Sequence, residues 1–438
     1  MCSSTHNAPH PNTLCATTGF NAKSLYVCPH CDWVTSAISD SEQPIDVRCK
    51  RCGHRITHQI VHQAVTLKWY ALSALLMLAM SMLYSFLGFS AKGVEHRIRF
   101  ADTIEVLLNN HFVALGILLS LLLILPVIYL LFAIYASASI EHKRTLPGLK
   151  FSLRMLWGIE PWLMMDVFLV GILVALIKLH SMAQVEFGLS FWPFCLFVVL
   201  LVKTLLLCDR VWLWNSLFPQ ANPESLQTGV ARTQGMTVCN CCGAVSHGLE
   251  GYCPRCSTHV QSRTKGHQQK TIALLIASCV MFIPANWFPI MDTAFLGSSH
   301  GSTILGGVIL LWATGSYPIA LVVFIASVVV PIFKILLLSW LCWQSRHQKP
   351  RSAKQLQHFY FFTEFIGRWS MIDIFVVAIL TALVQLGSLM RIIPGPAIIA
   401  FASVVVLTML AAQSFDPRSF WDTPRSPEDH STKETSLD

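Results

Sequence analysis

Two sets of cysteines have the spacing of tetrahedral metal ligands. In each set two Cys-x-x-Cys pairs are separated by a short spacer, of seventeen residues in the first set and ten in the second. Each pair aims two thiolates at one point, and two pairs complete a zinc site with sulfur about 2.3 Å from the metal and no open position. We therefore predict two structural zinc sites, each in a small zinc-ribbon domain, called ribbon 1 (25–64) and ribbon 2 (236–266). The ligands are Cys28, Cys31, Cys49, Cys52, Cys239, Cys242, Cys253 and Cys256.

The cysteines also allow other interpretations. A redox dithiol is one, although a closed four-thiolate site favours structural zinc. Cys241 lies beside the second set, and we expect it to be free because Cys242-Gly243 matches the Cys52-Gly53 pair of the first. The ribbons are expected to brace the protein, and the alternatives are a docking surface for a cytoplasmic factor or a zinc or redox sensor.

Charged and hydroxyl residues lie inside long apolar runs. The run 365–386 is apolar enough to cross a bilayer yet contains Arg368, Ser370 and Asp373. A charge inside a spanning helix costs a few kcal/mol, so it is a functional-site hypothesis by default. On a continuous helix Ser370 and Asp373 share one face. Lys334 lies in the preceding run, and it should pair with Asp373 because either charge is costly alone in hydrocarbon.

These residues allow two roles. Lys334, Asp373, Ser370 and Thr408 could line a polar cavity, a proton relay or a headgroup site, or the charged pair could only lock the helices together. Arg368 lies near a helix end, where its long side chain can reach the interface.

The sequence repeats itself. A weaker copy of the run occurs at 160–179, and the residues of the two copies pair at one offset, with Asp166 matching Asp373 (373 − 166 = 207). Asp166 is therefore the expected counterpart of Asp373. Lys178 and Lys203 are its candidate partners, but both could equally lie at helix ends and reach the interface, and helix register does not choose between these roles. Aligning Pro126 with Pro331 places Tyr129 where Lys334 stands, so the first half departs from the second at this position.

The composition indicates a polytopic membrane protein. Of the 438 residues 54% are hydrophobic and 12% charged, about half the charged fraction of soluble domains. The net charge of +8 is spread over the loops between apolar runs rather than gathered in one basic stripe, which argues against nucleic-acid binding. No cleavable signal peptide is expected, because residues 1–65 are polar and cysteine-bearing.

Eight apolar runs of spanning length organise the chain into two modules. We predict an all-α polytopic membrane protein with about eight transmembrane helices in two four-helix repeats and two small cytoplasmic zinc ribbons. The predicted segments are a disordered tail (1–24), ribbon 1 (25–64), module 1 (65–213), a linker (214–235), ribbon 2 (236–266), module 2 (267–415) and a cytoplasmic tail (416–438).

The orientation follows from basic loops. His142-Lys-Arg144 with Lys150 and Arg154, and the loop 346–354, lie on the side of both ribbons and both termini if each module has four spans. The positive-inside rule makes that side cytoplasmic. Closely spaced thiols also favour a reducing compartment.

Several longer motifs resemble one known family. Ile-Pro-Ala-Asn-x-x-Pro-Ile-Met (283–291), Gly-Val-Ile-Leu-Leu-Trp (307–312), Ile-Gly-Arg-Trp-Ser-Met-Ile-Asp (366–373) and Phe-Asp-Pro-Arg (415–418), together with the Cys-x-x-Cys pairs, resemble the paraquat-inducible protein A family of Gram-negative bacteria. The resemblance implies a multi-pass protein of the inner membrane. It also implies a periplasmic partner built from MCE domains and a system that moves phospholipid between the inner and outer membranes.

Three functions are compatible with these features. The first is a transport component that passes phospholipid to or from the MCE partner, and the second is an anchor that only docks this partner. The third, a membrane redox enzyme, requires cycling thiols, and we expect no enzyme activity. The sequence contains no Gly-x-x-x-x-Gly-Lys-Ser/Thr loop, so any energy would come from a proton gradient, a lipid gradient or another protein.

Overall fold

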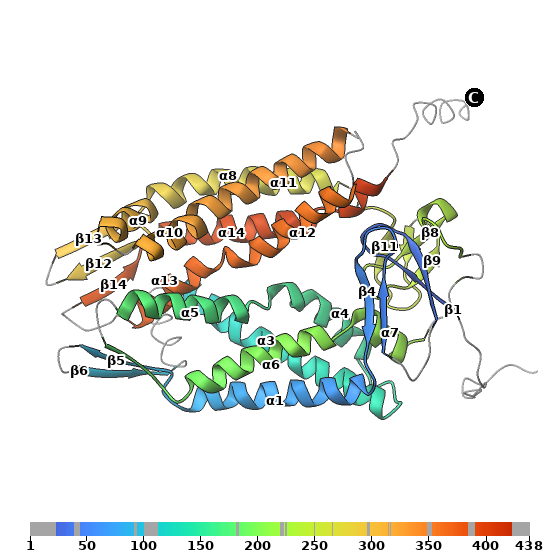
Figure 1. Ribbon diagram of the computed structural model, residues 1–438, viewed down its shortest axis with the longest axis horizontal. Helices are drawn as coiled ribbons and strands as arrows, with labels where there is room; N and C mark the ends of the chain where they lie inside the picture. The colour runs from blue at the N-terminus through green and yellow to red at the C-terminus, as the bar shows by residue number, and fades with distance from the viewer. Residues whose placement is uncertain are drawn as a thin grey trace, which may run out of the picture.

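The computed structural model is an elongated bundle of helices with small sheets at its two ends (Figure 1). It describes residues 23–38, 44–91, 94–99, 113–180, 184–219, 223, 226–248, 250–264, 266–295, 298–313, 315, 317–347, 353–383 and 390–422. The predicted N-terminal tail up to residue 22, residues 100–112 of module 1 and the tail from residue 423 lie outside this part.

Module 1 is built from six described helices. α1 packs against α3 and α6, and its buried residues Leu67, Ala71, Ala74 and Leu78 recur at alternating spacings of four and three. This is the narrow stripe by which one helix packs against its neighbours. The helices are α1 (Gln63–Leu83), α3 (Val113–Glu141), α4 (Leu149–Ile159), α5 (Met165–His180), α6 (Phe191–Leu207) and α7 (Arg210–Leu217).

Module 2 repeats this order with local changes. α14 packs along α8, and a π-helix (Ile325–Val329) interrupts the span formed by α10 and α11. The helices are α8 (His267–Trp287), α9 (Ile304–Ala313), α10 (Tyr317–Phe324), α11 (Val330–His347), α12 (Ala353–Trp369), α13 (Ile372–Leu383) and α14 (Ala397–Ser414), followed by the 3-10 helix η4 (Pro417–Trp421).

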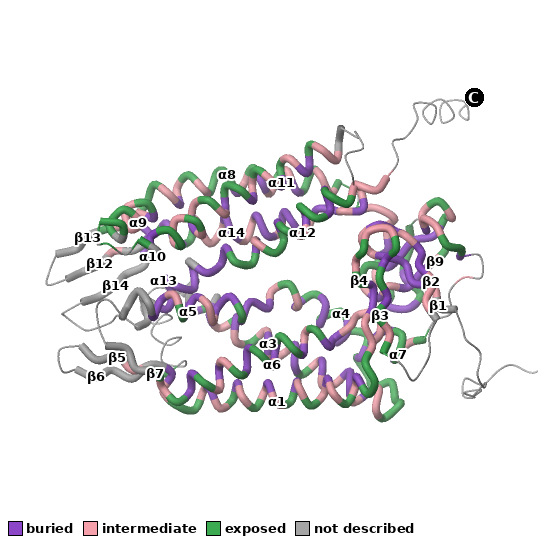
Figure 2. Tube along the Cα trace, in the orientation of Figure 1, coloured by how far each residue is buried: buried purple, intermediate pink, exposed green. Residues whose placement is uncertain are grey.

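The helices confirm a multi-pass membrane protein. Within the described residues six helices are long and apolar enough to span, and a seventh span results if α6 and α7, which meet at 62°, count as one. Surfaces of the outer helices are green and pink in Figure 2, as expected for side chains that face lipid. The remaining expected span contains α13, of which twelve residues are described, fewer than a bilayer requires.

The third span of each module is broken at the same place, which corrects the prediction of one continuous helix over 365–386. α12 ends at Trp369 and α13 begins at Ile372, and both boundaries lie 207 residues after the end of the 3-10 helix η1 (Glu160–Trp162) and the start of α5. Pro161 explains the first break. Asp373 and Asp166 are thereby second residues of helices, where the positive end of the helix dipole favours an acid.

A three-stranded antiparallel sheet ends each module on the side away from the ribbons, a feature that the all-helical prediction missed (Figure 1). The strand orders β6-β5-β7 and β13-β12-β14 correspond, as the repeat requires. The strands are β5 (Leu87–Ala91), β6 (Val94–Ile98), β7 (Gln184–Phe187), β12 (Met291–Phe295), β13 (Ser298–Ser302) and β14 (Met390–Pro394).

A glycine directly follows the third strand of each sheet, at a point where another backbone segment comes very close. A Cβ on Gly188 would lie 2.1 Å from the Ser85 carbonyl oxygen, and one on Gly395 would lie 2.1 Å from that of Pro289. Real Cβ atoms do not approach backbone so closely, so only glycine allows this close approach.

The two modules meet through α5 and α13. A Cβ on Gly171 would lie 3.2 Å from Phe375 Cβ, and the ring of Phe168 packs against that of Phe375. One hydrophobic cluster therefore includes module 1 together with α13 and part of α14. A smaller cluster joins α8, α11, α12 and α14.

Candidate functional site

Ribbon 1 brings its four predicted cysteines together. It consists of two hairpins, β1 (Lys23–Val27) with β2 (Val34–Ile38) and β3 (Ile45–Arg48) with β4 (Arg55–Gln59). The Sγ atoms of Cys28 and Cys52 are 3.5 Å apart and those of Cys31 and Cys49 are 3.4 Å apart. All four lie within 4.8 Å of one another, so they could hold one metal ion.

Ribbon 2 has the same construction. Its hairpins are β8 (Met236–Val238) with β9 (Val245–His247) and β10 (Glu250–Tyr252) with β11 (His259–Gln261). The Sγ distances are 3.5 Å for Cys239 and Cys256 and 3.5 Å for Cys242 and Cys253. Cys241 is outside this group, as expected.

Each Cys-x-x-Cys turn is closed by a residue with a positive φ. The backbone N–H of this residue donates to the carbonyl of the first cysteine, which folds both thiols to one side. The four residues are Asp32, Gly53, Gly243 and Ser257. Two of the turns therefore use glycine, which adopts this conformation without strain, and two accept a strained residue.

The thiols of a set cannot all ionise without a cation. Hydrogen bonding to Cys31 raises the pKa of Cys28, whereas hydrogen bonds from Cys28 and Cys31 lower the pKa of Cys52 to about 7. Because a metal dication binds thiolates rather than thiols, it would replace this divided protonation with four equivalent ligands.

An arginine in the second turn of each ribbon supports the site. Arg51 donates to the Cys31 carbonyl at 3.3 Å, and Arg255 donates to the Cys242 carbonyl at 3.4 Å. The same guanidinium groups lie over indole rings, Arg51 over Trp421 at 4.5 Å and Arg255 over Trp214 at 6.0 Å. Trp214 and Trp421 are again 207 residues apart. Ribbon 1, which precedes module 1, is thus attached to the end of module 2, and ribbon 2, which precedes module 2, is attached to the end of module 1.

Ribbon 1 rests on module 2. The rings of His30 and His54 contact Phe361 on α12 at 4.9 and 5.9 Å. On the same helix, the Gln357 side chain accepts a hydrogen bond from the Trp421 indole N–H at 3.0 Å. Ribbon 1 also touches module 1, where the Asp209 carboxylate accepts from the Thr57 hydroxyl at 2.9 Å.

A partly buried ion network joins ribbon 1, ribbon 2 and the C-terminal segment. Arg263 donates to Asp32 at 2.5 Å and to Asp422 at 2.6 Å. Arg418, itself buried, donates to Asp416 at 3.0 Å. Residues 416–422, expected to begin a tail, are therefore part of the folded protein.

Ribbon 2 rests on module 1. Arg154 of α4 donates to the Cys256 carbonyl, and Arg255 donates to the Phe218 carbonyl at 2.7 Å. The segment expected to be a linker (214–235) also contributes, because Gly229 accepts from Val34 of ribbon 1 at 2.7 Å and Trp33 bridges to Val230. The two ribbons consequently share an apolar cluster and form one unit.

In the membrane part, Lys334 is the most unusual of the predicted site residues. It lies on α11 and is 1% exposed, and its ammonium has no hydrogen-bond partner among the described residues. The space that it occupies exists because residue 367 of α12 is a glycine: a Cβ there would lie 2.8 Å from Lys334 Nζ. Gly367 belongs to the motif 366–373 that resembles the known family, but it was not predicted as a site residue.

The other predicted residues divide into two groups. Ser370, in the break after α12, and Thr408, on α14, are each 2% exposed. Arg368 and Asp166 are exposed, so Asp166 does not enter a buried polar site. Asp373 is placed only by its backbone, as the second residue of α13, and its predicted pairing with Lys334 remains a prediction.

Ser327, seven residues before Lys334, lies in the π-helix with 3% of its surface exposed. Such π-helical turns are rare and often occur at functional sites. The sequence does contain a signal for this interruption, because Pro331 has no backbone N–H to donate to the carbonyl of Ser327 four residues earlier.

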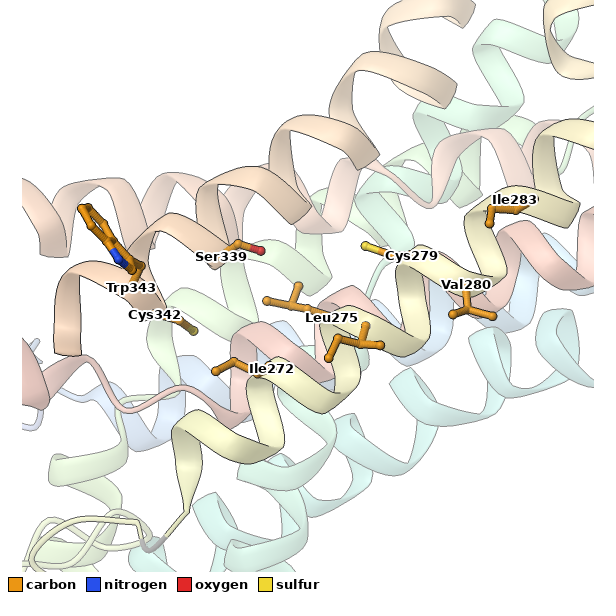
Figure 3. Close-up of a pocket in the computed structure, with 9 residues that line it drawn as sticks. Ile272, Leu275, Cys279, Val280, Ile283, Ser339, Cys342 and Trp343 are labelled. Atoms are coloured by element: carbon orange, nitrogen blue, oxygen red, sulfur yellow. The ribbon is translucent and has the colours of Figure 1, made fainter. Parts of the chain in front are cut away.

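A separate apolar cavity opens between α8 and α11 (Figure 3). Its volume is about 440 Å³, and Leu275, Cys279, Ile283 and Trp343 are among its lining residues. The only oxygen-bearing side chain of the lining belongs to Ser339. The cavity can accept hydrocarbon but offers no charged group.

Comparisons with known proteins agree with the repeat. The sequence profile of paraquat-inducible protein A matches residues 66–218 and again residues 268–424. The chain is 39% identical over 412 residues to the intermembrane transport protein PqiA of Escherichia coli strain K12. The aligned region covers 93% of this chain and 97% of that protein.

Two further relatives are more distant. A probable intermembrane transport protein of Haemophilus influenzae is 28% identical over 424 residues, covering 94% and 98% of the two chains. The lipophilic envelope-spanning tunnel protein A of E. coli is 32% identical over 275 residues, covering 63% of each. No solved structure matches. The relatives are transport proteins rather than enzymes.

Proposed function

The chain belongs to the paraquat-inducible protein A family, and from this premise we propose that it is an integral inner-membrane component of a lipid transport system. It passes phospholipid or a similar hydrophobic molecule between the inner membrane and a periplasmic MCE-domain partner, and so maintains the envelope. The names of its relatives, which include intermembrane transport and envelope spanning, support this role.

The observation that carries the proposal is the buried ammonium of Lys334. An unpaired charge in a spanning helix is costly and persists where it serves a pathway or a ligand. Lys334 lies beside the break that separates α12 from α13, with Ser370 at the break and Gly367 against its ammonium. We propose that Lys334, Ser370, Thr408 and Asp373 form the polar site, with Arg368 at its edge.

The ribbon end is proposed to be cytoplasmic, with both termini on that side, because the basic loops lie there. The two three-stranded sheets at the opposite end then face the periplasm. They are the surface on which the MCE partner would dock.

The two cysteine sets are proposed to bind zinc. Four thiolates in tetrahedral reach suit Zn²⁺, and the sites are structural because four protein ligands leave no open position. Each ribbon braces the end of the opposite module through Arg51 or Arg255.

The test separates transport from anchoring. Lys334→Met and Asp373→Asn variants are expected to reach normal abundance and to copurify with the MCE partner, but to lose envelope function. Lys203→Met is the matched control, because Lys203 is an exposed lysine on a spanning helix of module 1. Full envelope function in both variants would contradict a transport site and leave the anchor role, in which the protein only docks its partner.

A further inference from the structure

The apolar cavity of module 2 lies between two helices whose counterparts pack closely in module 1. α8 corresponds to α1, because both have 21 residues and their bounds differ by 204 (267 − 63 = 204). α11 corresponds to the second half of α3 through Pro331 and Pro126 (331 − 126 = 205). α1 packs along α3, whereas α8 packs much less extensively against α11. The repeat therefore contains the same pair of helices once closed and once with a space between them.

Two exchanges between the modules account for this space. Cys279 of α8 stands where module 1 has Leu75, and Ser339 of α11 stands where it has Ile134. Leu75 and Ile134 pack against the hydrophobic cluster of module 1, whereas Cys279 and Ser339 are exposed and line the cavity. Figure 3 shows both side chains pointing into the space between α8 and α11. A smaller side chain in place of a packed aliphatic one leaves a cavity where the surroundings do not collapse.

The two helices remain joined at the end near the ribbons. In module 1, Lys68 of α1 forms an ion pair with Glu141 of α3 at 2.7 Å. Ile272, the residue equivalent to Lys68, belongs instead to the lining of the cavity. One turn closer to the ribbons, Gln268 of α8 donates to the Ser345 hydroxyl of α11 at 3.0 Å. The cavity is therefore a space between linked helices, and it begins where the apolar part of α8 begins.

The dimensions of the cavity select its occupant. Its lining on α8 extends from Ile272 to Ile283, about 16 Å at 1.5 Å per residue. This is about the depth of one leaflet, half of a hydrocarbon core about 30 Å thick. A volume of about 440 Å³ over this length gives a mean cross-section of about 27 Å², about a third of that of a helix about 10 Å in diameter. A helix of a partner or of a second copy is therefore too wide, and an extended hydrocarbon chain is narrow enough.

We propose that the cavity binds one acyl chain of a phospholipid from the leaflet on the ribbon side. The chain fills the space that Leu75 and Ile134 fill in module 1, against a floor formed by the buried residues Leu275 and Cys342. Trp343, 55% exposed and near the ribbon end of α11, lies where an amphipathic ring meets lipid headgroups.

The bound lipid is resident rather than transported. Lys334 is directed toward α12, where it lies against Gly367, so α11 separates it from the cavity on the side of α8. The lining contains no charged side chain, and the site therefore recognises the hydrocarbon chain and does not select a headgroup. Its role is to complete the packing of module 2.

A photoreactive phospholipid measures occupancy of the cavity. The full chain is held in nanodiscs of phosphatidylethanolamine and phosphatidylglycerol with a small fraction of phosphatidylethanolamine that carries a diazirine in one acyl chain. After irradiation, mass spectrometry measures the label on each helix. Label on residues 272–283 should exceed that on the exposed α6 residues Val199 and Leu206 by at least about fivefold, which corresponds to a preference of about 1 kcal/mol.

Variants that copy module 1 into module 2 test the origin of the site. The double variant Cys279→Leu/Ser339→Ile should reduce the label on residues 272–283 to the level of α6, with normal yield and metal content. Cys279→Leu alone should reduce it in part, which keeps the test valid if the double variant does not fold. Ala79→Leu enlarges an exposed residue of α1, and this matched control should leave the label unchanged.

Competition identifies the occupant. Excess unlabelled phosphatidylethanolamine and phosphatidylglycerol should reduce the label equally; a strong preference for one of them would show a headgroup site and contradict recognition by the chain alone. Stronger competition by a free fatty acid would assign the cavity to that ligand and overturn the phospholipid. Loss of the label when the periplasmic partner is added would assign it to a protein segment. Equal labelling of α8 and α6, or full labelling of a folded double variant, would show surrounding lipid only and refute the site.

Discussion

Phe168 and Phe375 occupy equivalent positions in the two modules, and their rings meet edge to face at 5.3 Å with an interplanar angle of 89°. A residue that contacts its own counterpart lies on or near a two-fold axis, as in the interface of a symmetric dimer. The offset of 207 residues, found first as a sequence repeat, is therefore also the relation between the contacting surfaces of α5 and α13.

The Phe168–Phe375 contact is expected to stabilise the association of the modules. Phe375→Ala should lower stability by about 3 kcal/mol, the low end of the range for Phe→Ala in a core, because detergent or lipid can partly fill the gap. Thermal unfolding of the purified protein measures this. Phe151→Ala removes a side chain that is 60% exposed and should change the stability little. An equal loss of stability in both variants would contradict a stabilising role of the Phe168–Phe375 contact.

The close approach at each sheet can be tested at its glycines. Gly188→Ala and Gly395→Ala should each lower the yield and the melting temperature, because the new Cβ would meet a carbonyl oxygen at 2.1 Å. Gly307→Ala is the matched control, since a Cβ there meets no atom within 4 Å and lies in a helix. That variant should be neutral or more stable by up to about 1 kcal/mol.

The adjacent residues Cys241 and Cys242 offer a sharp test of the metal site. Cys242→Ser should reduce bound zinc from two ions per chain to one and lower the abundance of the protein. Cys241→Ser should keep both ions. Metal analysis of the purified chains decides the point; two zinc ions in Cys242→Ser would show that the ligand set is wrong. Cys28→Ser should likewise lower abundance rather than activity per molecule.

The ion network at the ribbons predicts an acid-dependent stability. Burial alone would raise the pKa of Asp416, but hydrogen bonds and charge from Arg418 more than offset it and hold the pKa below its usual range. This contribution is complete above the unfolded pKa, about 3.9, and is lost as the pH falls through the lower folded value.

Melting curves from pH 7 to pH 3 measure this effect. Asp416→Asn should be less stable than the parent chain by a constant amount down to about pH 5, and the difference should shrink below about pH 4. Zinc loss in acid affects both chains and cancels in the comparison. Asp46→Asn, at an exposed ion pair, should cost less than about 1 kcal/mol. A difference for Asp416→Asn that does not depend on pH would contradict the role given to its charge.

Gly367 is expected to be required for the position of Lys334. Gly367→Ala would place a Cβ 2.8 Å from Lys334 Nζ and displace the ammonium, so the variant should assemble with its partner yet lose most envelope function. Gly158→Ala adds the same group to α4 in open space and should retain function. Similar activity of the two variants would show that the ammonium need not be held where it lies.

The ligand sets and the repeat could be predicted because both are visible as regular spacings in the sequence. Two Cys-x-x-Cys pairs define their site without knowledge of the fold, and the offset between Asp166 and Asp373 needs no structure. Arg51 and Arg255, which lie in the second Cys-x-x-Cys turn of each ribbon, and their tryptophan partners were not predicted as site residues. The offset of 207 residues nevertheless relates Trp214 to Trp421. Comparison of the two copies residue by residue would have found them.

The broken spans and the far sheets required the structure. No proline marks the break at Ser370, and hydropathy alone does not distinguish a bent span from a straight one. The signals were Arg368, Ser370 and Asp373 inside the run and Pro161 at the equivalent break of module 1. The strands β12 and β13 consist largely of small and polar residues without the alternation of a half-buried strand. The docking of ribbon 1 on Phe361 depends on contacts more than three hundred residues apart, which no local pattern reports.

Ribbon 1 stands at the start of the described chain and rests against its end, with Asp32, Arg263 and Asp422 in one network. The four parts, ribbon 1, module 1, ribbon 2 and module 2, therefore form a closed ring of contacts, in which the last part touches the first. A circularly permuted protein, opened between the two modules near residue 223 and joined from its C-terminus to its N-terminus, would retain every ribbon contact. Equally, two separate chains of one ribbon and one module each could assemble as a dimer in which each copy caps the other.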